Sequence, residues 1–265
     1  MTAGRQTIPG EPAVRVLILS PTGSESPPLG RPAVLHLHGG GMVTGSPQFE
    51  ALGGGRLARA LGAVVVSPDY RLAPEHPFPA ALDDCMVTLR WMREHSRQVG
   101  IDPDRIGVVG ASAGGGLSAA VAQRAQDEGI TLCAQVLIYP MLDDRTAVRD
   151  DVADRGQFVW TPQGNLFGWT AYLGRPPRLS DAPPYASPAR RQDLSGLAPA
   201  WIGVGDRDLL HDEAVDYAQR LTACGVATEL VDVPGMYHGA DGLAGKRPVM
   251  QAFRHSSEQH LRKYL

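Results

Sequence analysis

Short runs of apolar and β-branched residues recur along the chain, and segments with a helical spacing of apolar residues separate them. This alternation is typical of repeated strand–helix–strand units around a largely parallel sheet. The clearest helical segment places Leu82, Met86 and Leu89 on one face. The pattern predicts strands at residues 14–19, 33–37, 63–66, 105–109, 133–138, 200–204 and 228–233, and helices at residues 81–98, 113–126, 212–223 and 247–264.

Residues 143–191 interrupt this rhythm, because they contain no strand pattern. A connection of this length is usually functional, and open α/β sheets bind ligands at the carboxyl ends of their strands. We therefore predict a single domain over residues 1–265, with an insertion at about 143–191 that forms a lid over that edge. The insertion contains the aromatic residues Phe158, Trp160, Phe167, Trp169, Tyr172 and Tyr185.

Composition narrows the possible partners and location of the protein. The 25 Lys and Arg residues are balanced by 28 Asp and Glu residues, and no basic run provides the charge that nucleic-acid binding needs. The three cysteines are scattered, which argues against a disulfide framework or a zinc site. No stretch approaches the roughly 18 apolar residues of a membrane span, and the first ten residues lack the apolar core of a signal peptide. We expect a cytoplasmic protein with no membrane span, and a homodimer is left open.

The clearest candidate for chemistry is Ser112. It stands in a Gly-Ala-Ser-Ala-Gly sequence at residues 110–114, between a predicted strand and a predicted helix. A serine at the tip of such a turn adopts a strained backbone that exposes its hydroxyl, and flanking glycines remove side chains that would collide there. The alternative is a glycine-rich helix N-terminus that binds an anion.

A second glycine-rich turn, His-Gly-Gly-Gly at residues 38–41, directly follows a predicted strand. Successive glycines let backbone N–H groups converge, as stabilisation of an oxyanion requires. The turn could instead be merely flexible, and His36 with His38 could be a metal pair. No other motif in the sequence completes a ligand set, so we expect no metal.

A nucleophilic serine needs a base and an acid that orients it. His238 is the best placed of the eight histidines, because it lies in a loop directly after the last predicted strand. The acid should follow the preceding strand, where Asp206, Asp208 and Asp212 compete. The chain order of serine, acid and histidine is the one expected of an α/β-hydrolase.

Five stretches together resemble the bacterial hormone-sensitive-lipase-like esterases of the α/β-hydrolase superfamily. Residues 38–41 and 110–115 carry the two glycine motifs, and residues 69–81 read Asp-Tyr-Arg-Leu-Ala-Pro-Glu-His-Pro-Phe-Pro-Ala-Ala. Residues 208–213 resemble the family's usual Asp-Pro-Leu-Arg-Asp-Glu stretch, and residues 238–239 its His-Gly pair. The resemblance implies an α/β-hydrolase fold with a mostly parallel sheet, and a carboxylesterase without a cofactor.

The same resemblance implies roles for individual residues. Ser112 would be the nucleophile, His238 the general base and then acid, and Asp208 the orienting acid. The oxyanion donors would be the amides of Gly40, Gly41 and Ala113, with an uncertainty of one residue over Gly39. The charged residues of the 69–81 stretch, Asp69, Arg71 and Glu75, would brace the oxyanion turn without a catalytic role.

One departure concerns the N-terminal side. Family members usually carry a longer N-terminal stretch that contributes cap helices, whereas here the first strand is predicted near Val14. Residues 143–191 would then be the remaining lid. The predicted activity is hydrolysis of short-chain or small carboxylic esters through an acyl-enzyme. The alternatives are a catalytically silent ligand-binding homologue, and an amidase or lactonase with the same three residues.

Overall fold

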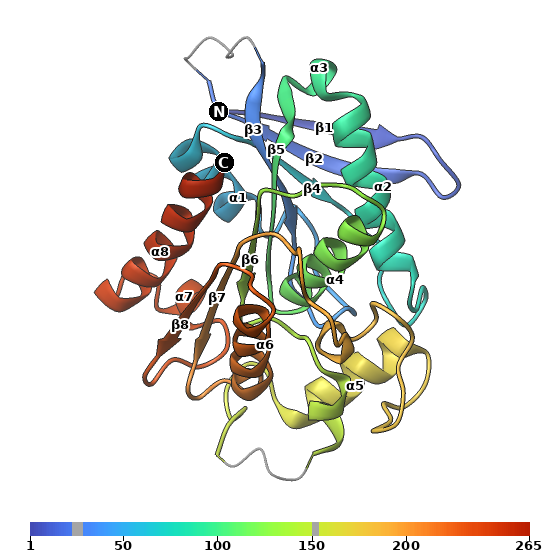
Figure 1. The fold of residues 1–265 in the computed structure, drawn as a ribbon, viewed down its shortest axis with the longest axis vertical. Helices are drawn as coiled ribbons and strands as arrows, with labels where there is room; N and C mark the ends of the chain where they lie inside the picture. The colour runs from blue at the N-terminus through green and yellow to red at the C-terminus, as the bar shows by residue number, and fades with distance from the viewer. Residues whose placement is uncertain (23–28, 150–153) are drawn as a thin grey trace.

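The computed structural model describes residues 1–22, 29–149 and 154–265, and a twisted eight-stranded sheet runs through its centre (Figure 1). The strand order is β1-β2-β4-β3-β5-β6-β7-β8. The pairings of β1 with β2 and of β2 with β4 are antiparallel, and all the others are parallel. The strands are β1 (Thr2–Ile8), β2 (Val14–Ser20), β3 (Arg31–Leu37), β4 (Val64–Pro68), β5 (Ile101–Ala111), β6 (Ala134–Ile138), β7 (Ala200–Gly205) and β8 (Thr228–Val233).

The predicted fold class is confirmed, and each of the seven predicted strands is present within a few residues of its expected bounds. The expectation that the first strand begins near Val14 is wrong, because β1 precedes it and pairs antiparallel with β2. Strand β1 is an edge strand, and most of its residues are exposed and polar. It therefore lacks the alternation of buried and exposed positions by which a strand is recognised in a sequence.

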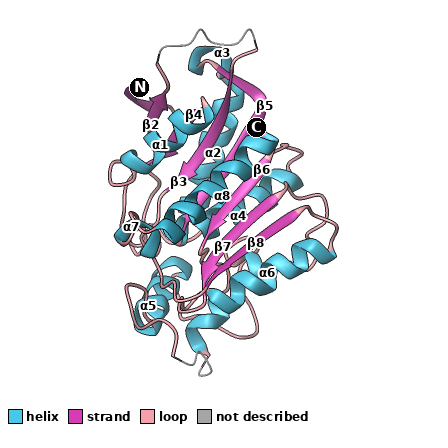
Figure 2. Ribbon diagram, turned by 90° about the vertical axis from the view of Figure 1, so that its left-hand side faces the viewer, coloured by secondary structure: helices cyan, strands magenta, loops and turns pink. Residues whose placement is uncertain are grey.

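Helices cover both faces of the sheet (Figures 1 and 2). Helices α1 and α8 pack together on one face, and α2, α4 and α6 cover the other. Helix α2 begins at the predicted place, but the expected single helix at 81–98 is interrupted at His95. The helices are α1 (Ala51–Leu61), α2 (Ala80–Glu94), α3 (Ser96–Val99), α4 (Ala113–Asp127), α5 (Pro162–Leu173), α6 (His211–Ala223), α7 (Ala240–Leu243) and α8 (Pro248–Tyr264), with short 3₁₀ helices η1 (Asp144–Val148) and η2 (Pro188–Arg190).

The insertion predicted at 143–191 contains no strand among its described residues, and residues 150–153 lie outside the described part of the chain. Its main element is α5, which Thr161 begins by accepting a hydrogen bond from the Gly164 N–H (3.2 Å). Pro162 occupies the first turn, where its fixed φ favours a helix. Figure 1 shows α5 beyond the carboxyl ends of β6 and β7.

The parallel arrangement brings the predicted functional segments to one edge of the sheet. The loops that follow β3, β5, β7 and β8 carry the His-Gly-Gly-Gly turn, Ser112, Asp208 and His238, respectively. Because carboxyl ends of parallel strands meet at the same edge, these four segments lie together. In residues 1–22, 29–149 and 154–265, no helix is long and apolar enough to span a bilayer.

Close backbone packing of α4 yields a testable difference between two glycines. A Cβ at Gly114 would lie 2.1 Å from the Leu37 carbonyl oxygen, whereas a Cβ at Gly53 in α1 would meet nothing within 4 Å. We expect Gly114→Ala to lower the free energy of unfolding by about 3 kcal/mol, because backbone must move. Gly53→Ala should raise it by about 1 kcal/mol through helix propensity. Urea denaturation measures both, and equal effects at the two positions would contradict this packing.

Candidate active site

Ser112 occupies a sharp turn between β5 and α4. Its backbone has φ 58° and ψ −121°, which is a strained conformation for a residue other than glycine. The turn requires glycine at position 110, because a Cβ there would lie 2.1 Å from the Gly114 carbonyl oxygen. The end of β6 holds the Ser112 backbone, because the Ser112 N–H donates a hydrogen bond to the Ile138 carbonyl (2.9 Å). The strand, turn and helix predicted around Ser112 are therefore present.

His238 lies between Ser112 and Asp208. Its Nε2 is 2.9 Å from the Ser112 Oγ, and its Nδ1 is 2.8 Å from the Asp208 Oδ2. Ser112, His238 and Asp208 are 8%, 5% and 1% exposed, so the three groups interact away from bulk water. Asp208 Oδ1 also accepts the Leu210 N–H (3.0 Å), which fixes the carboxylate orientation. The geometry matches that of a nucleophile, a base and an orienting acid.

The two other aspartates considered as the acid have different partners. Asp206 accepts the Gly235 N–H (2.7 Å), and in this way holds the loop that carries His238. Asp212 pairs with Arg155 (2.6 Å) and contacts His211 (3.0 Å). Of the three candidates, only Asp208 contacts His238.

The His-Gly-Gly-Gly turn lies beside Ser112, since a Cβ at Gly39 would be 3.6 Å from the Ser112 Cβ, and the turn has two open donors. The Gly40 carbonyl accepts the N–H groups of Val43 and Thr44, which closes the turn. In the described part of the chain, the N–H groups of Gly40 and Gly41 have no hydrogen-bond acceptor. The N–H of Gly39 donates to the Glu50 Oε1 (2.8 Å), so Gly39 is not among the open donors.

Ala113 is placed to complete this set of donors. It is the first residue of α4, and the N–H groups of a first helical turn have no acceptor within the helix. A partial positive charge at the helix N-terminus adds to the attraction for an anion.

The stretch at residues 69–81 does brace the oxyanion turn, but through different side chains from those expected. The Tyr70 hydroxyl donates to the His38 carbonyl (2.6 Å), and its ring stacks on the His38 ring at 4.0 Å. The Ala73 N–H donates to the Met42 carbonyl (2.9 Å).

The charged residues of this stretch have other partners. Arg71 binds Asp84 of α2 through paired hydrogen bonds (2.9 to 3.1 Å), and Asp69 pairs with Arg15 (2.7 Å). Glu75 is exposed. Asp69 and Arg71 thus hold the surrounding loop, as expected of structural residues, whereas among the described residues none of the three has a hydrogen bond or ion pair to the turn itself.

Trp160 of the insertion covers the oxyanion turn. A Cβ at Gly41 would lie 2.4 Å from its Cη2, and its ring lies 6.1 Å from the His238 ring. The indole Nε1 donates to the Asn165 Oδ1 (3.1 Å), which ties Trp160 to α5. Among the aromatic residues of the insertion, Trp160 is the one in contact with the turn and near His238.

Two further residues of the site were not among the candidates predicted from the sequence. Tyr139 follows β6 with a positive φ of 34°, and its ring lies 4.6 Å from that of His238. Its hydroxyl donates to the Asp241 Oδ1 (2.7 Å). Glu50, the residue before α1, contacts Gly39 across the sheet edge. Only the strand-end position of Tyr139 could have suggested it.

His36 and His38, which the sequence left open as a metal pair, have other partners in the structure. Across residues 1–22, 29–149 and 154–265, no group of three or more His, Cys, Asp or Glu side chains is arranged to hold a metal ion. His38 Nδ1 lies 2.8 Å from the Gly39 carbonyl oxygen, and His36 Nδ1 lies 3.3 Å from the Ser67 Oγ. Burial lowers the pKa of His36 to about 4, which keeps its imidazole neutral at pH 7.

Comparison with known proteins agrees with this geometry. Residues 34–241 match the profile of a family with the α/β-hydrolase fold. The chain is 38% identical to esterase LipI of Mycobacterium tuberculosis over 221 residues, which cover 82% of this chain and 68% of that protein. It is 40% identical to carboxylesterase NlhH of the same organism over 223 residues, 78% of this chain and 66% of the relative. The matches thus span about two thirds of each relative.

Solved structures agree as well. A bacterial heroin esterase superposes with a TM-score of 0.93 at 34% identity, covering 100% of this chain and 84% of that one. The chain belongs to the α/β-hydrolase family, in the branch of hormone-sensitive-lipase-like carboxylesterases. The resemblance inferred from the sequence motifs is confirmed.

The lowered pKa of His36 predicts a pH dependence of stability. In the unfolded chain this histidine takes up a proton below about pH 6.5, whereas in the folded chain it stays neutral down to about pH 4. The unfolded state therefore binds more protons in this range, and the free energy of unfolding falls as the pH falls. From about pH 7.5 to about pH 5 the contribution of His36 is on the order of 2 kcal/mol.

Denaturation of His36→Asn beside the wild type measures this contribution. Glu50 Oε2 lies 3.6 Å from the His36 Nε2, and burial raises the pKa of Glu50. Uptake of a proton by Glu50 therefore opposes the loss of stability on acidification. Both proteins contain Glu50, so the comparison between them isolates His36. We expect a smaller loss of stability on acidification in His36→Asn. The exposed His255→Asn is the control and should follow the wild type. An equal loss in all three proteins would refute the assignment.

Proposed function

We propose that this protein is a serine carboxylesterase that hydrolyses short-chain or small carboxylic esters through an acyl-enzyme. The observation that carries the proposal is the continuous contact from Ser112 through His238 to Asp208 at the carboxyl edge of the sheet. The open N–H groups of Gly40, Gly41 and Ala113 around the same serine support it, as do relatives named esterases at 38–40% identity.

In this proposal Ser112 Oγ attacks the ester carbonyl carbon while His238 Nε2 takes the hydroxyl proton. The carbonyl oxygen becomes an oxyanion and accepts hydrogen bonds from Gly40, Gly41 and Ala113. The C–O bond to the alcohol then breaks, and His238 returns the proton to the departing oxygen. Water repeats the sequence on the acyl-enzyme, which releases the carboxylic acid and regenerates the Ser112 hydroxyl.

Asp208 keeps His238 in the tautomer that this sequence requires. Its carboxylate accepts a hydrogen bond at Nδ1, which leaves Nε2 free to take the proton from serine. It also stabilises the positive charge of the imidazolium, and its own orientation is fixed by the Leu210 N–H. No step requires a metal or an organic cofactor.

Two alternatives use the same fold. A ligand-binding homologue would not need Ser112, His238 and Asp208 to be hydrogen-bonded to one another, so their contacts at 2.8 and 2.9 Å argue for catalysis. An amidase or lactonase would use the same acyl-enzyme, and the names of the relatives favour esters.

We further propose one domain over residues 1–265, in which the chain around α5 acts as the lid of the site. The contact of Trp160 with Gly41 supports this role. A cytoplasmic location is proposed because all three cysteines, Cys85, Cys133 and Cys224, are unpaired thiols. A homodimer stays a prediction, and sedimentation analysis would test it.

The proposed activity is tested with a short-chain p-nitrophenyl ester and the purified protein beside Ser112→Ala. Removal of the nucleophile is expected to lower kcat on the order of 10⁶-fold, because the remaining groups act only as a unit. Equal melting temperatures of the two proteins serve as the control for folding. An inactive but folded wild type would rule out the esterase function, and an active variant would rule out Ser112 as the nucleophile.

The position of Trp160 predicts a limit on substrate size. Trp160→Ala should raise kcat/KM for a bulky acyl ester relative to the acetate by roughly 10-fold, because the space over Gly41 opens. Phe167→Ala is the matched control, since Phe167 is in the same insertion but 60% exposed. A chain-length series with both variants measures the ratio. The same ratio in both variants would show that Trp160 does not bound the substrate site.

A further inference from the structure

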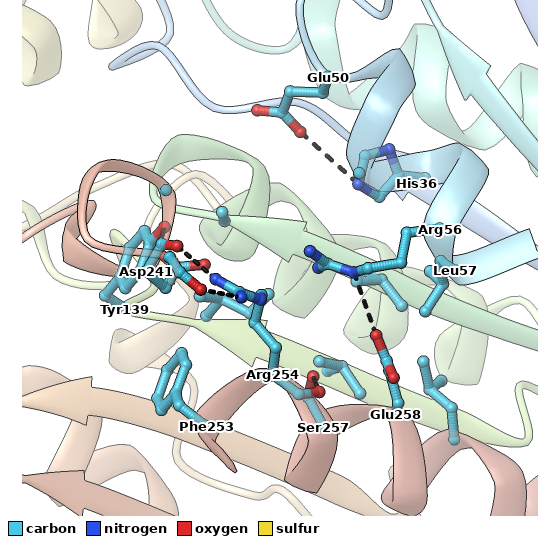
Figure 3. Close-up of a pocket in the computed structure, with 18 residues that line it drawn as sticks. His36, Glu50, Arg56, Leu57, Tyr139, Asp241, Phe253, Arg254, Ser257 and Glu258 are labelled. Atoms are coloured by element: carbon cyan, nitrogen blue, oxygen red, sulfur yellow. Dashed lines mark hydrogen bonds and ion pairs between the residues drawn. The ribbon is translucent and has the colours of Figure 1, made fainter. Parts of the chain in front are cut away.

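Glu50 reaches the oxyanion turn from the face of the sheet that α1 and α8 cover. Its Oε1 accepts the Gly39 N–H at 2.8 Å, and its Oε2 lies 3.6 Å from the His36 Nε2. Figure 3 shows Glu50 and His36 together at one side of a cavity of about 470 Å³. The opposite side is formed by Tyr139 and Arg254.

From its position in the sequence, Glu50 would be expected to cap helix α1. It directly precedes α1, a position at which a polar side chain can accept a hydrogen bond from the first turn of the helix. Here its side chain makes no such capping bond. The carboxylate is directed to Gly39 instead.

Of the three glycine N–H groups in the turn, the one that Glu50 binds, that of Gly39, is the one with a hydrogen-bond acceptor in the described part of the chain. The carbonyls of the turn have their own partners: Tyr70 binds that of His38, His38 Nδ1 binds that of Gly39, and the Gly40 carbonyl accepts N–H groups further along. With the Gly39 N–H held by Glu50, rotation of this peptide would break that hydrogen bond and leave the N–H without its acceptor. The N–H groups of Gly40 and Gly41 are then the ones left open.

The surroundings of the carboxylate strengthen this bond. Burial raises the pKa of Glu50, and the Gly39 N–H opposes that rise because it stabilises the ionised form. His38 and Asp241 are the other charged or titratable groups that act on it, besides the neutral His36. In a partly buried site a hydrogen bond to any acceptor oxygen, ionised or neutral, is stronger than it is in water.

We propose that Glu50 is a positioning residue for the oxyanion turn: its carboxylate orients the Gly39 peptide so that the amides of Gly40 and Gly41 point at the reacting carbonyl oxygen. The inference rests on the proposed esterase function. Glu50 acts through Gly39 and touches no reacting atom. The required property is an acceptor oxygen at the right reach, and a negative charge is not required.

Four variants separate reach from charge. Glu50→Gln keeps the acceptor oxygen and removes the charge, whereas Glu50→Asp keeps the charge and withdraws the oxygen by one methylene. Glu50→Ala removes both. Glu258→Ala is the matched control, because Glu258 lines the same cavity and pairs with Arg56 without contact to the turn (Figure 3).

The measurements are kcat and KM on a short-chain p-nitrophenyl ester, and the Ki of a trifluoromethyl ketone that forms an oxyanion on addition of Ser112. We expect Glu50→Asp and Glu50→Ala to lose about 10- to 100-fold in kcat, because misplaced donors lower transition-state stabilisation. KM should change less than about 3-fold, and Ki should weaken by the same factor as kcat/KM. Glu50→Gln and Glu258→Ala should stay within about 3-fold of the wild type.

Other patterns overturn the inference in distinguishable ways. Loss of kcat in Glu50→Gln with retention in Glu50→Asp would show that the negative charge of Glu50, and not the reach of its oxygen, is what matters. Lower melting temperatures with unchanged kcat and Ki would show a purely structural role. A wild type that is folded but inactive on every ester would refute the proposed function itself, and the role of Glu50 with it.

Discussion

The backbone of α4 approaches strands β3 and β5 with no side chain between them, and the rest of the site depends on this approach. A Cβ at Gly114 would collide with the Leu37 carbonyl, and one at Gly110 would collide with the Gly114 carbonyl. Only this closeness lets the chain reverse within one residue at the end of β5. The strained φ of Ser112 is thus imposed by packing, and the packed core on both faces of the sheet maintains it.

The other groups of the site are each held by a hydrogen bond from outside the catalytic residues. Asp206 binds the loop that carries His238, and the Leu210 amide orients Asp208. Tyr70 and Glu50 hold opposite sides of the turn that follows β3. Because the contacts of Leu210, Tyr70 and Glu50 are buried or partly buried, the donors and the acid keep their directions before any substrate binds, which is the condition for electrostatic preorganisation.

Much of this arrangement could be predicted from the sequence because loops after parallel strands meet at one edge. Ser112 and His238 each followed a recognisable strand, so their proximity was implied once the strand pattern was read. The choice of Asp208 over its neighbours came from the family resemblance, and of the three aspartates only Asp208 contacts His238 in the structure. Strand β1 was missed because its exposed polar residues carry no hydrophobic alternation.

Other features could not be predicted, because they arise only from packing. Glu50 is a single carboxylate in a loop, and no spacing rule relates it to Gly39. Helix α1 was missed because its three consecutive glycines disfavour a helix, and packing against α8 overrides that preference. The sequence did not show which of the six aromatic residues in the insertion lines the site. In the structure, Trp160 is the one that packs against Gly41.

The central claim is that Ser112, and no other hydroxyl in the chain, is the activated nucleophile of the site. Incubation with paraoxon, whose phosphorus takes the place of the ester carbonyl carbon, followed by intact-mass and peptide mass spectrometry, tests it most directly. The account predicts one diethylphosphoryl group per chain, on the peptide that contains Ser112, with one equivalent of p-nitrophenol released. A protein that stays unlabelled, or one labelled on another residue, would contradict it.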